Sequence, residues 1–413
     1  MTGAQWGDEG KGKIVDILAE SHDIVLRANG GANAGHTIFA NGRKHIFHLI
    51  PSGILQGKTC VIGNGCVIEM AELAQEIADL EHAGFSNVRH NLKISDRAHL
   101  IFDFHKKIDA AIEKKKVKKL GTTLRGIGPA FADKISRTGI RAGILKNWEL
   151  FAQRLAKNAQ RAQENFQIEI DLENELAQHK RFAQEFGGMI CDSVEFLHTQ
   201  LENGKKILAE GAQGSLLDID LGTFPFVTSS NTTAAGICTG SGLPPGAVGE
   251  VIGILKSYTT RVGEGPFPSE LENETGEKLR EIGQEFGATT GRPRRCGWLD
   301  LPVANFARRI NGITAWNLTK LDVLDTFAEI EIVTDYFLDG ENLKSFPADL
   351  QDLARVECRS ITLPGWRTSI ADCRSFADLP ENCQKYVLRI EELTGVKVKF
   401  IGTGPNREQM IER

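Results

Sequence analysis

The chain has 413 residues, of which 41% are hydrophobic and 25% charged, and its formal net charge is −5. These values are typical of a globular protein with a large core, and they give no electrostatic reason to expect a nucleic-acid partner. No apolar run approaches the length that spans a bilayer, and the eight cysteines are scattered without metal-binding spacing. We therefore expect free thiols and a cytoplasmic protein that binds neither membrane nor nucleic acid.

Apolar, β-branched runs alternate along the chain with helix-like segments. Such alternation predicts an α/β fold with a largely parallel central sheet flanked by helices. The predicted strands span residues 23–28, 59–64, 206–211, 248–258, 313–320, 329–337 and 396–402. The predicted helices span residues 70–84, 104–116, 275–287 and 383–395, and residues 148–203 have room for two or three more. We expect one large α/β domain over residues 1–413, with a mostly helical insertion over residues 100–205.

The first motif, GDEGKGKI at residues 7–14, fits most of the phosphate-loop pattern G-x-x-x-x-G-K-[ST]. We expect the loop to open a helix and to cradle a phosphate on its backbone N–H groups. The last position of the pattern normally holds Mg²⁺ through a hydroxyl, but here it is Ile14. Phosphate would repel Asp8 inside the loop unless this residue binds a metal or takes a proton, which indicates a catalytic role. The alternative is a Gly-rich turn with solvated lysines.

Three further stretches suggest ligand contacts. TKLD at residues 319–322 ends a predicted strand, and the Asp322 carboxylate could accept both hydrogen-bond donors of guanine; a capped strand-to-helix turn is the alternative. Three arginines within residues 292–295 suit bidentate recognition of carboxylate or phosphate, unless they form a solvated basic loop. His36, in the Gly-rich stretch NAGH, could act as an acid beside Asp8.

Together these motifs resemble the adenylosuccinate synthetase family. Matching stretches run in order from end to end, among them QWGDEGKGKIVD (5–16), GGANAGHT (30–37), GTTLRGIGPA (121–130), EGAQGSLLDID (210–220), FGATTGRPRRCGWLD (286–300) and LTKLDVLD (318–325). The resemblance implies a homodimeric enzyme with one Mg²⁺ per subunit. Its reaction would be the GTP-dependent ligation of L-aspartate to IMP through 6-phosphoryl-IMP, giving adenylosuccinate, GDP and phosphate for AMP synthesis. A regulatory P-loop GTPase and a non-enzymatic nucleotide-binding protein are the alternatives; Ile14 argues against the GTPase.

The resemblance also implies roles for individual residues. Asp8 would remove the N1 proton of IMP, His36 would act as an acid toward the phosphate, and Lys11 and Gln213 would assist; Asp8 and the Gly35 carbonyl would hold Mg²⁺. The implied GTP contacts are Gly7, Asp8, Glu9, Gly10, Lys11, Gly12, Lys13, Gly35, His36, Thr37, Arg294, Lys320, Leu321, Asp322, Gly402, Thr403 and Gly404. The implied IMP contacts are Asp8, Lys11, Asn33, Ala34, Gly35, His36, Thr123, Gln213, Thr228, Arg292 and, from the neighbouring subunit, Arg137. The implied aspartate contacts are Ala288, Thr289, Thr290, Gly291, Arg292 and Arg294.

Three positions depart from the family pattern. The chain begins MTGAQWGD, without the short apolar strand that precedes the loop in the family, so we expect either an upstream start or a less firmly anchored loop. Leu124 stands where Gly is common, in a loop expected to order around IMP. Gly402 replaces a Ser, which could remove one side-chain contact to guanine.

Overall fold

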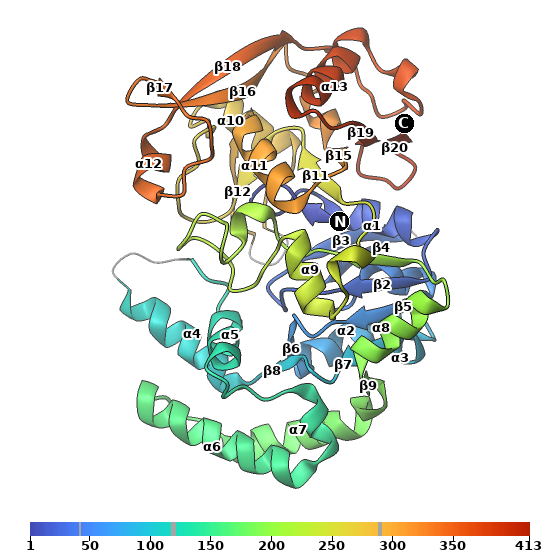
Figure 1. Cartoon of the computed structure of the whole chain (residues 1–413), viewed down its shortest axis with the longest axis vertical. Helices are drawn as coiled ribbons and strands as arrows, with labels where there is room; N and C mark the ends of the chain where they lie inside the picture. Colours follow the sequence, from blue (N-terminus) through green and yellow to red (C-terminus); the bar gives the residue numbers. More distant parts are fainter. Residues whose placement is uncertain (41–42, 117–120, 288–290) are drawn as a thin grey trace.

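The computed structural model describes residues 1–40, 43–116, 121–287 and 291–413. Its centre is built from two five-stranded sheets that meet near the N-terminus (Figure 1). The first sheet has the order β1 (Thr2–Gly3), β11 (Ile252–Lys256), β15 (Ala315–Thr319), β19 (Val398–Gly402) and β20 (Met410–Glu412). The second has the order β10 (Ile207–Glu210), β2 (Ile24–Arg27), β5 (Thr59–Ile62), β7 (Leu92–Ser95) and β9 (Ile190–Cys191).

The first residues of the chain join these two sheets. Met1 donates a hydrogen bond to the carbonyl of Ala209 at 2.8 Å and accepts one from the backbone N of Gly211 at 3.0 Å, beside β10. Residues 2–3 pair in parallel with β11 on the other side. All neighbouring strands within the two sheets are parallel except β19 and β20, so the largely parallel sheet predicted from the sequence is confirmed.

The strands of the central sheets are buried because helices cover both faces. All residues of β2 (IVLR) and β11 (IGILK) are buried, as expected for parallel strands with continuous apolar sequence. Two large apolar clusters form the core: one includes Val25 and Ile62 of the second sheet, and the other includes Leu255 and Trp316 of the first.

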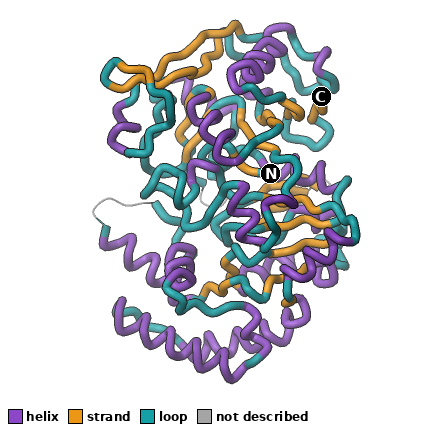
Figure 2. Tube along the Cα trace, viewed as in Figure 1, coloured by secondary structure: helices purple, strands orange, loops and turns teal. Residues whose placement is uncertain are grey.

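The described residues also form thirteen α-helices. Their bounds are α1 (Lys11–Ala19), α2 (Met70–His82), α3 (Val88–Asn91), α4 (Asp103–Lys115), α5 (Ile127–Ile135), α6 (Trp148–Phe166), α7 (Leu172–Phe186), α8 (Ser193–Glu202), α9 (Ala234–Ser241), α10 (Glu274–Ile282), α11 (Leu301–Asn311), α12 (Leu350–Arg355) and α13 (Glu381–Thr394). Helices α4 to α7 gather at the end of the long axis opposite the C-terminus (Figures 1 and 2). No helix within the described ranges is long and apolar enough to cross a membrane.

Smaller sheets complete the fold. They are the hairpin β3 (His36–Ala40) with β4 (Arg43–Phe47), the pair β6 (Val67–Glu69) with β8 (His99–Ile101), the pair β12 (Thr259–Arg261) with β13 (Arg295–Gly297), and a sheet of β14 (Leu299–Asp300), β16 (Glu329–Leu338), β17 (Glu341–Asn342) and β18 (Glu357–Pro364). The predicted strand over 329–337 is therefore real but belongs to this peripheral sheet, where β16 pairs mainly with β18. Strand β18 and helix α11 were not predicted.

Candidate active site

Residues 4–10 connect β1 to α1, and Glu9 anchors this connection from inside. The Glu9 carboxylate is completely buried and accepts hydrogen bonds from the backbone N of Gln5 (3.0 Å) and of Gly7 (2.9 Å). The side-chain amide of Gln5 donates to the carbonyl of Tyr258 at 3.0 Å, which fastens the loop to the chain beyond β11. These contacts hold the loop firmly, in contrast to the weak anchoring considered from the sequence.

The start of α1 presents free backbone N–H groups, as a phosphate-binding helix start requires. Gly10 precedes the helix in the left-handed region, with φ of 84°. Gly12 lies so close to β3 that a Cβ there would be 2.8 Å from the carbonyl oxygen of Thr37. Ile14 is completely buried in the core, so the side chain at this position points away from the loop and no metal-holding hydroxyl is offered here.

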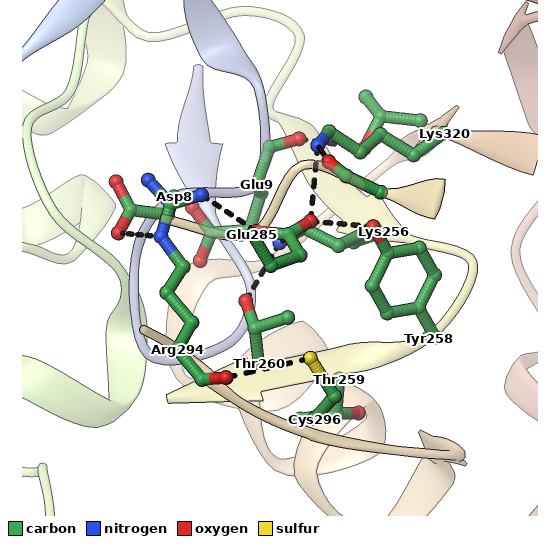
Figure 3. Close-up of polar contacts among 12 residues, drawn as sticks. Asp8, Glu9, Lys256, Tyr258, Thr259, Thr260, Glu285, Arg294, Cys296 and Lys320 are labelled. Carbon is green, nitrogen blue, oxygen red and sulfur yellow. Dashed lines mark hydrogen bonds and ion pairs between the residues drawn. The ribbon is translucent and has the colours of Figure 1, made fainter. Parts of the chain in front are cut away.

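Asp8 and Arg294, both predicted site residues, form an ion pair (Figure 3). The Asp8 carboxylate is 36% exposed and lies 2.9 Å from Nε of Arg294, which is 10% exposed. Burial alone would lower the pKa of Arg294, but Asp8 and Glu285 outweigh it and hold the pKa above its ordinary value. The fold thus brings the loop over residues 7–13 together with the segment that carries Arg292, Arg294 and Arg295, called the arginine loop below.

The imidazole of His36 is held by Glu210, at the end of β10. Nδ1 of His36 contacts Oε1 of Glu210, whereas Nε2 is buried without a protein partner. Glu210 also accepts hydrogen bonds from N (2.8 Å) and Oγ (3.0 Å) of Ser52. Burial lowers the pKa of His36, against the effect of Glu210. Burial alone would raise the pKa of Glu210, but His36 and Arg27 reverse the direction. An ionised Glu210 therefore fixes the imidazole through Nδ1 and leaves Nε2 for a ligand.

Further unpartnered polar atoms mark the region predicted to bind IMP. Both amide atoms of Gln213 are buried without partners, and this residue lies against the loop, because a Cβ at Gly7 would be 3.8 Å from Cα of Gln213. Nδ2 of Asn33 donates to Oγ1 of Thr228 at 3.3 Å, while Oδ1 of Asn33 has no partner. Because unsatisfied buried polar groups are rare, these atoms indicate a site for a polar ligand.

The residues predicted to bind guanine also meet. Nζ of Lys13 donates to the carbonyl of Gly404 at 2.7 Å, and burial lowers the pKa of Lys13 to about 8 while Asp322 opposes this. Burial raises the pKa of Asp322, and Lys13 and Lys320 counteract the shift. Oγ1 of Thr403 is buried without a partner, so the region predicted to bind guanine also has an unsatisfied polar group.

The structure shows the backbone setting of two departures from the family pattern, Leu124 and Gly402. Leu124 has φ of 57°, a left-handed conformation that glycine adopts without strain, and its side chain is 48% exposed. At Gly402, by contrast, a Cβ would lie 3.4 Å from Nζ of Lys13, so a serine would fit without displacement. Gly121, near Leu124, approaches the arginine loop, because a Cβ there would be 3.2 Å from Nη1 of Arg292.

Some predicted residues are not brought into this arrangement. Ala288, Thr289 and Thr290 lie outside the described residues. Arg137 is exposed just after α5, and Thr123 and Gly291 are also exposed. The side chain of Leu321 is completely buried, which leaves only its backbone for a ligand. Lys11 is buried and paired with Glu9, and Ala34 and Gly35 directly precede β3.

Two general features of the described residues bear on ligands. They contain no group of three or more His, Cys, Asp or Glu side chains that could hold a metal ion by themselves. A cavity of about 560 Å³ lies between residues 263–266 and α12, and Arg295 is the one member of the predicted arginine cluster that lines it.

Sequence reasoning missed three charged residues that support the site. Glu210 pairs with His36, and Glu285 pairs with Lys256, Lys320 and Arg294. Glu210 ends a predicted strand within the matched stretch EGAQG, a position that could have marked it, whereas nothing in the local sequence distinguishes Lys256 or Glu285.

Comparisons with known proteins agree on one family. The sequence profile of adenylosuccinate synthetase matches residues 1–411. An adenylosuccinate synthetase of Trichoplax adhaerens is 51% identical over 418 residues, which cover 100% of this chain and 95% of the relative. A chloroplastic adenylosuccinate synthetase of Ostreococcus tauri is 51% identical over 416 residues, covering 100% of this chain and 86% of the relative.

Solved structures extend the comparison to three dimensions. The fully ligated adenylosuccinate synthetase of Plasmodium falciparum superposes with a TM-score of 0.96 at 44% identity, covering 100% of this chain and 98% of that one. The succinoaminodeoxyadenylate synthetase of cyanophage S-2L, bound to dGMP and dATP, has a TM-score of 0.63 at 20% identity, with 100% and 93% covered. This second match shows a shared fold alone.

Proposed function

This chain belongs to the adenylosuccinate synthetase family, and we propose that the loop over residues 7–13, His36 and Gln213 carry out the family's reaction in it. The enzyme is a ligase that uses GTP to join L-aspartate to IMP, giving adenylosuccinate, GDP and phosphate in AMP synthesis. The observation that carries the residue assignment is that unpartnered buried atoms of His36 and Gln213 adjoin a phosphate-binding loop that contains a carboxylate.

In the first step, Asp8 takes the proton from N1 of IMP, and O6 attacks the γ-phosphorus of GTP. The O6–P bond forms as the bond from the γ-phosphorus to GDP breaks, which gives 6-phosphoryl-IMP. Nε2 of His36 faces the transferring phosphate as an acid, and Lys11 and Gln213 stabilise the developing charge. In the second step, the amino group of aspartate displaces the phosphate from C6. Arg294, paired with Asp8 in the absence of ligands, would turn to the aspartate carboxylate and leave Asp8 free for IMP.

We assign the Asp8 carboxylate and the carbonyl of Gly35 as the protein ligands of one Mg²⁺ per subunit. Mg²⁺ commonly binds one or two carboxylates together with substrate phosphates, and a partly exposed carboxylate in a phosphate loop fits this preference. When bound, the ion would neutralise charge on the phosphates of GTP.

The remaining substrate contacts follow from the same assignment. Lys320, Asp322 and residues 402–404 would bind guanine, and residues 288–294 would bind aspartate. We propose a homodimer in which the exposed Arg137 reaches the IMP phosphate of the neighbouring subunit. We also propose a cytoplasmic location, which the eight free cysteines support, and a single α/β domain with a helical subdomain over residues 100–205.

The test is a substrate-omission assay. Protein, Mg²⁺, GTP, IMP and aspartate are mixed, and GDP and adenylosuccinate are followed while each component is left out in turn. We expect adenylosuccinate only in the complete mixture, and we expect Asp8→Asn to abolish it. GDP release that is indifferent to IMP and aspartate would instead make the chain a GTPase.

Asp339 offers a matched control for Asp8. It too has a left-handed backbone (φ 51°) and an arginine partner, Arg355, but it lies in the turn between β16 and β17. We expect Asp339→Asn to retain full activity. Equal losses in Asp8→Asn and Asp339→Asn would contradict a chemical role for Asp8.

A further inference from the structure

One buried carboxylate, Glu285, collects donors from three segments of the chain (Figure 3). Its Oε1 lies 3.0 Å from Nζ of Lys256 and 3.0 Å from Nζ of Lys320, and it also accepts the hydroxyl of Tyr258. Its Oε2 accepts a hydrogen bond from Nη1 of Arg294 at 2.6 Å. Both oxygens are therefore occupied, by three cations and one phenol.

The charges in this cluster are largely buried, and three cations surround a single carboxylate. Glu285 and Lys256 are completely buried. Burial alone would raise the pKa of Glu285, but Lys256, Lys320 and Arg294 outweigh it and hold the pKa far below its ordinary value. Burial lowers the pKa of Lys256 to about 8, and Glu285 opposes this shift. The single negative charge of Glu285 thus pairs with three cations, and each cation would lose a partner if the Glu285 carboxylate were removed.

Two of these cations face different ends of the proposed site. Arg294 contacts Glu285 through Nη1 and Asp8 through Nε, at 2.9 Å. Lys320 lies two positions before Asp322 in the guanine-reading stretch, has a left-handed backbone (φ 56°) and is 31% exposed. The third cation, from β11, is sealed inside and contacts no part of the proposed site directly.

Glu285 also closes the base of the arginine loop through its main chain. The backbone N of Arg294 donates to the carbonyl of Glu285 at 2.9 Å, and Phe286 and Pro293 form an isolated antiparallel bridge next to it. The main-chain contact between Glu285 and Arg294 therefore lies beside the ion pair of their side chains, so a shift of the Glu285 carboxylate would move Arg294 as well.

We infer that Glu285 is a positioning residue that holds Lys320 at the guanine end and Arg294 at the acceptor end of the site on one carboxylate. This inference rests on the proposed function, because the two ends are defined by it. Glu285 contacts no substrate and acts through the two cations. Its loss impairs the binding of GTP and of aspartate together, although the two substrates contact different residues.

The test is Glu285→Gln, which keeps the size of the side chain and removes its charge. We expect the KM for GTP and the KM for aspartate each to rise at least about five-fold, with a smaller change in kcat per folded enzyme. Asp300→Asn is the matched control: Asp300 is completely buried and accepts the hydroxyl of Tyr336 at 2.6 Å, away from both cations. This control is expected to lower the melting temperature and leave both KM values unchanged.

A rise in only one KM, or a fall in kcat at constant KM, would overturn the inference. If Glu285→Gln does not fold, Tyr258→Phe removes a single hydrogen bond to the same oxygen. We expect a smaller rise in both KM values in that variant, and unchanged values would count against the inference. If the wild-type chain makes no adenylosuccinate, the proposed function itself is wrong. If the wild type is active but Glu285→Gln has normal KM values, only the inference about Glu285 is wrong.

Discussion

Replacing Glu210 by Gln isolates what the buried carboxylate does for His36. The amide has one oxygen and one NH₂ group, whereas the carboxylate offers an acceptor to the backbone N of Ser52 (2.8 Å) and another to Nδ1 of His36. The oxygen of the new side chain is expected to keep the bond to Ser52, because the opposite orientation would leave a buried N–H unsatisfied at a cost of about 1–3 kcal/mol. The NH₂ group then faces Nδ1, which must become an acceptor.

The expected effect of Glu210→Gln on catalysis is large, and we also expect a moderate loss of stability. Glu210 raises the pKa of His36 against the effect of burial, so its removal lowers the pKa further and disfavours the imidazolium, the form that can act as an acid from Nε2. A positioned general acid contributes about 10²–10⁴ in rate, and we expect kcat to fall at least about 10²-fold. The completely buried Arg27 also loses the nearby negative charge of Glu210, so the stability loss should exceed that of one neutral hydrogen bond and reach about 1–3 kcal/mol.

The assay is GDP release at saturating GTP, IMP and aspartate, together with thermal unfolding of the same samples. KM values should change by less than about three-fold, because Glu210 contacts no substrate in the proposed complex. Asp300→Asn again serves as the control for loss of a buried carboxylate. A Glu210→Gln variant with kcat within about ten-fold of wild type would refute the reasoning, and so would a loss of activity that only tracks a loss of folded protein.

Three further predictions test other parts of the structure. Asp322→Asn should lower kcat/KM for GTP by roughly 10⁴-fold and should favour xanthosine triphosphate, whose 2-oxo group can accept from the new amide; equal use of both nucleotides by wild type would contradict this. Glu76, whose pKa burial raises to about 7, binds its proton more tightly when folded, so stability should fall as pH rises from about 5 to 7.5, and urea unfolding should show a flatter profile for Glu76→Gln. Mixing inactive Arg137→Leu and Asp8→Asn dimers should restore up to about a quarter of wild-type activity if sites are shared between subunits, whereas no recovery would argue against sharing.

The features that could be predicted from the sequence are those whose physics is local. The loop over residues 7–13, which we propose to bind phosphate through its own backbone, is revealed directly by its glycines and lysines. Most buried parallel strands are continuous apolar runs bounded by polar residues, and each predicted strand overlaps an observed one. In the same way, the guanine-binding role that we propose for TKLD, at the end of β15, was predicted from four consecutive residues.

The parts that could not be predicted depend on contacts between distant segments. Glu210 matters because β10 ends opposite His36, and Glu285 because the start of the arginine loop meets β11 and the residue after β15. The local sequence around Glu285 does not differ from that of an ordinary surface glutamate, whereas the place of Glu210 at the end of a predicted strand could have marked it. Strand β18 was missed for a similar reason: it is largely exposed, so its sequence lacks an apolar run, and its pairing with β16 defines it as a strand.

Asp8, Gln213 and Lys320 share one backbone feature, since each adopts a left-handed conformation, with φ of 57°, 59° and 56°. For residues other than glycine this conformation costs about 1–2 kcal/mol each. Glycine at any of the three would relieve that strain and remove the side chain that the chemistry needs. The conflict is most direct at Gln213, whose side-chain amide has no protein partner to lose, whereas Asp8 pairs with Arg294 and Lys320 with Glu285. Selection for heat resistance alone would therefore favour glycine at Gln213, against activity. A screen that is meant to stabilise this enzyme should hold these positions fixed and look for improvement elsewhere in the fold.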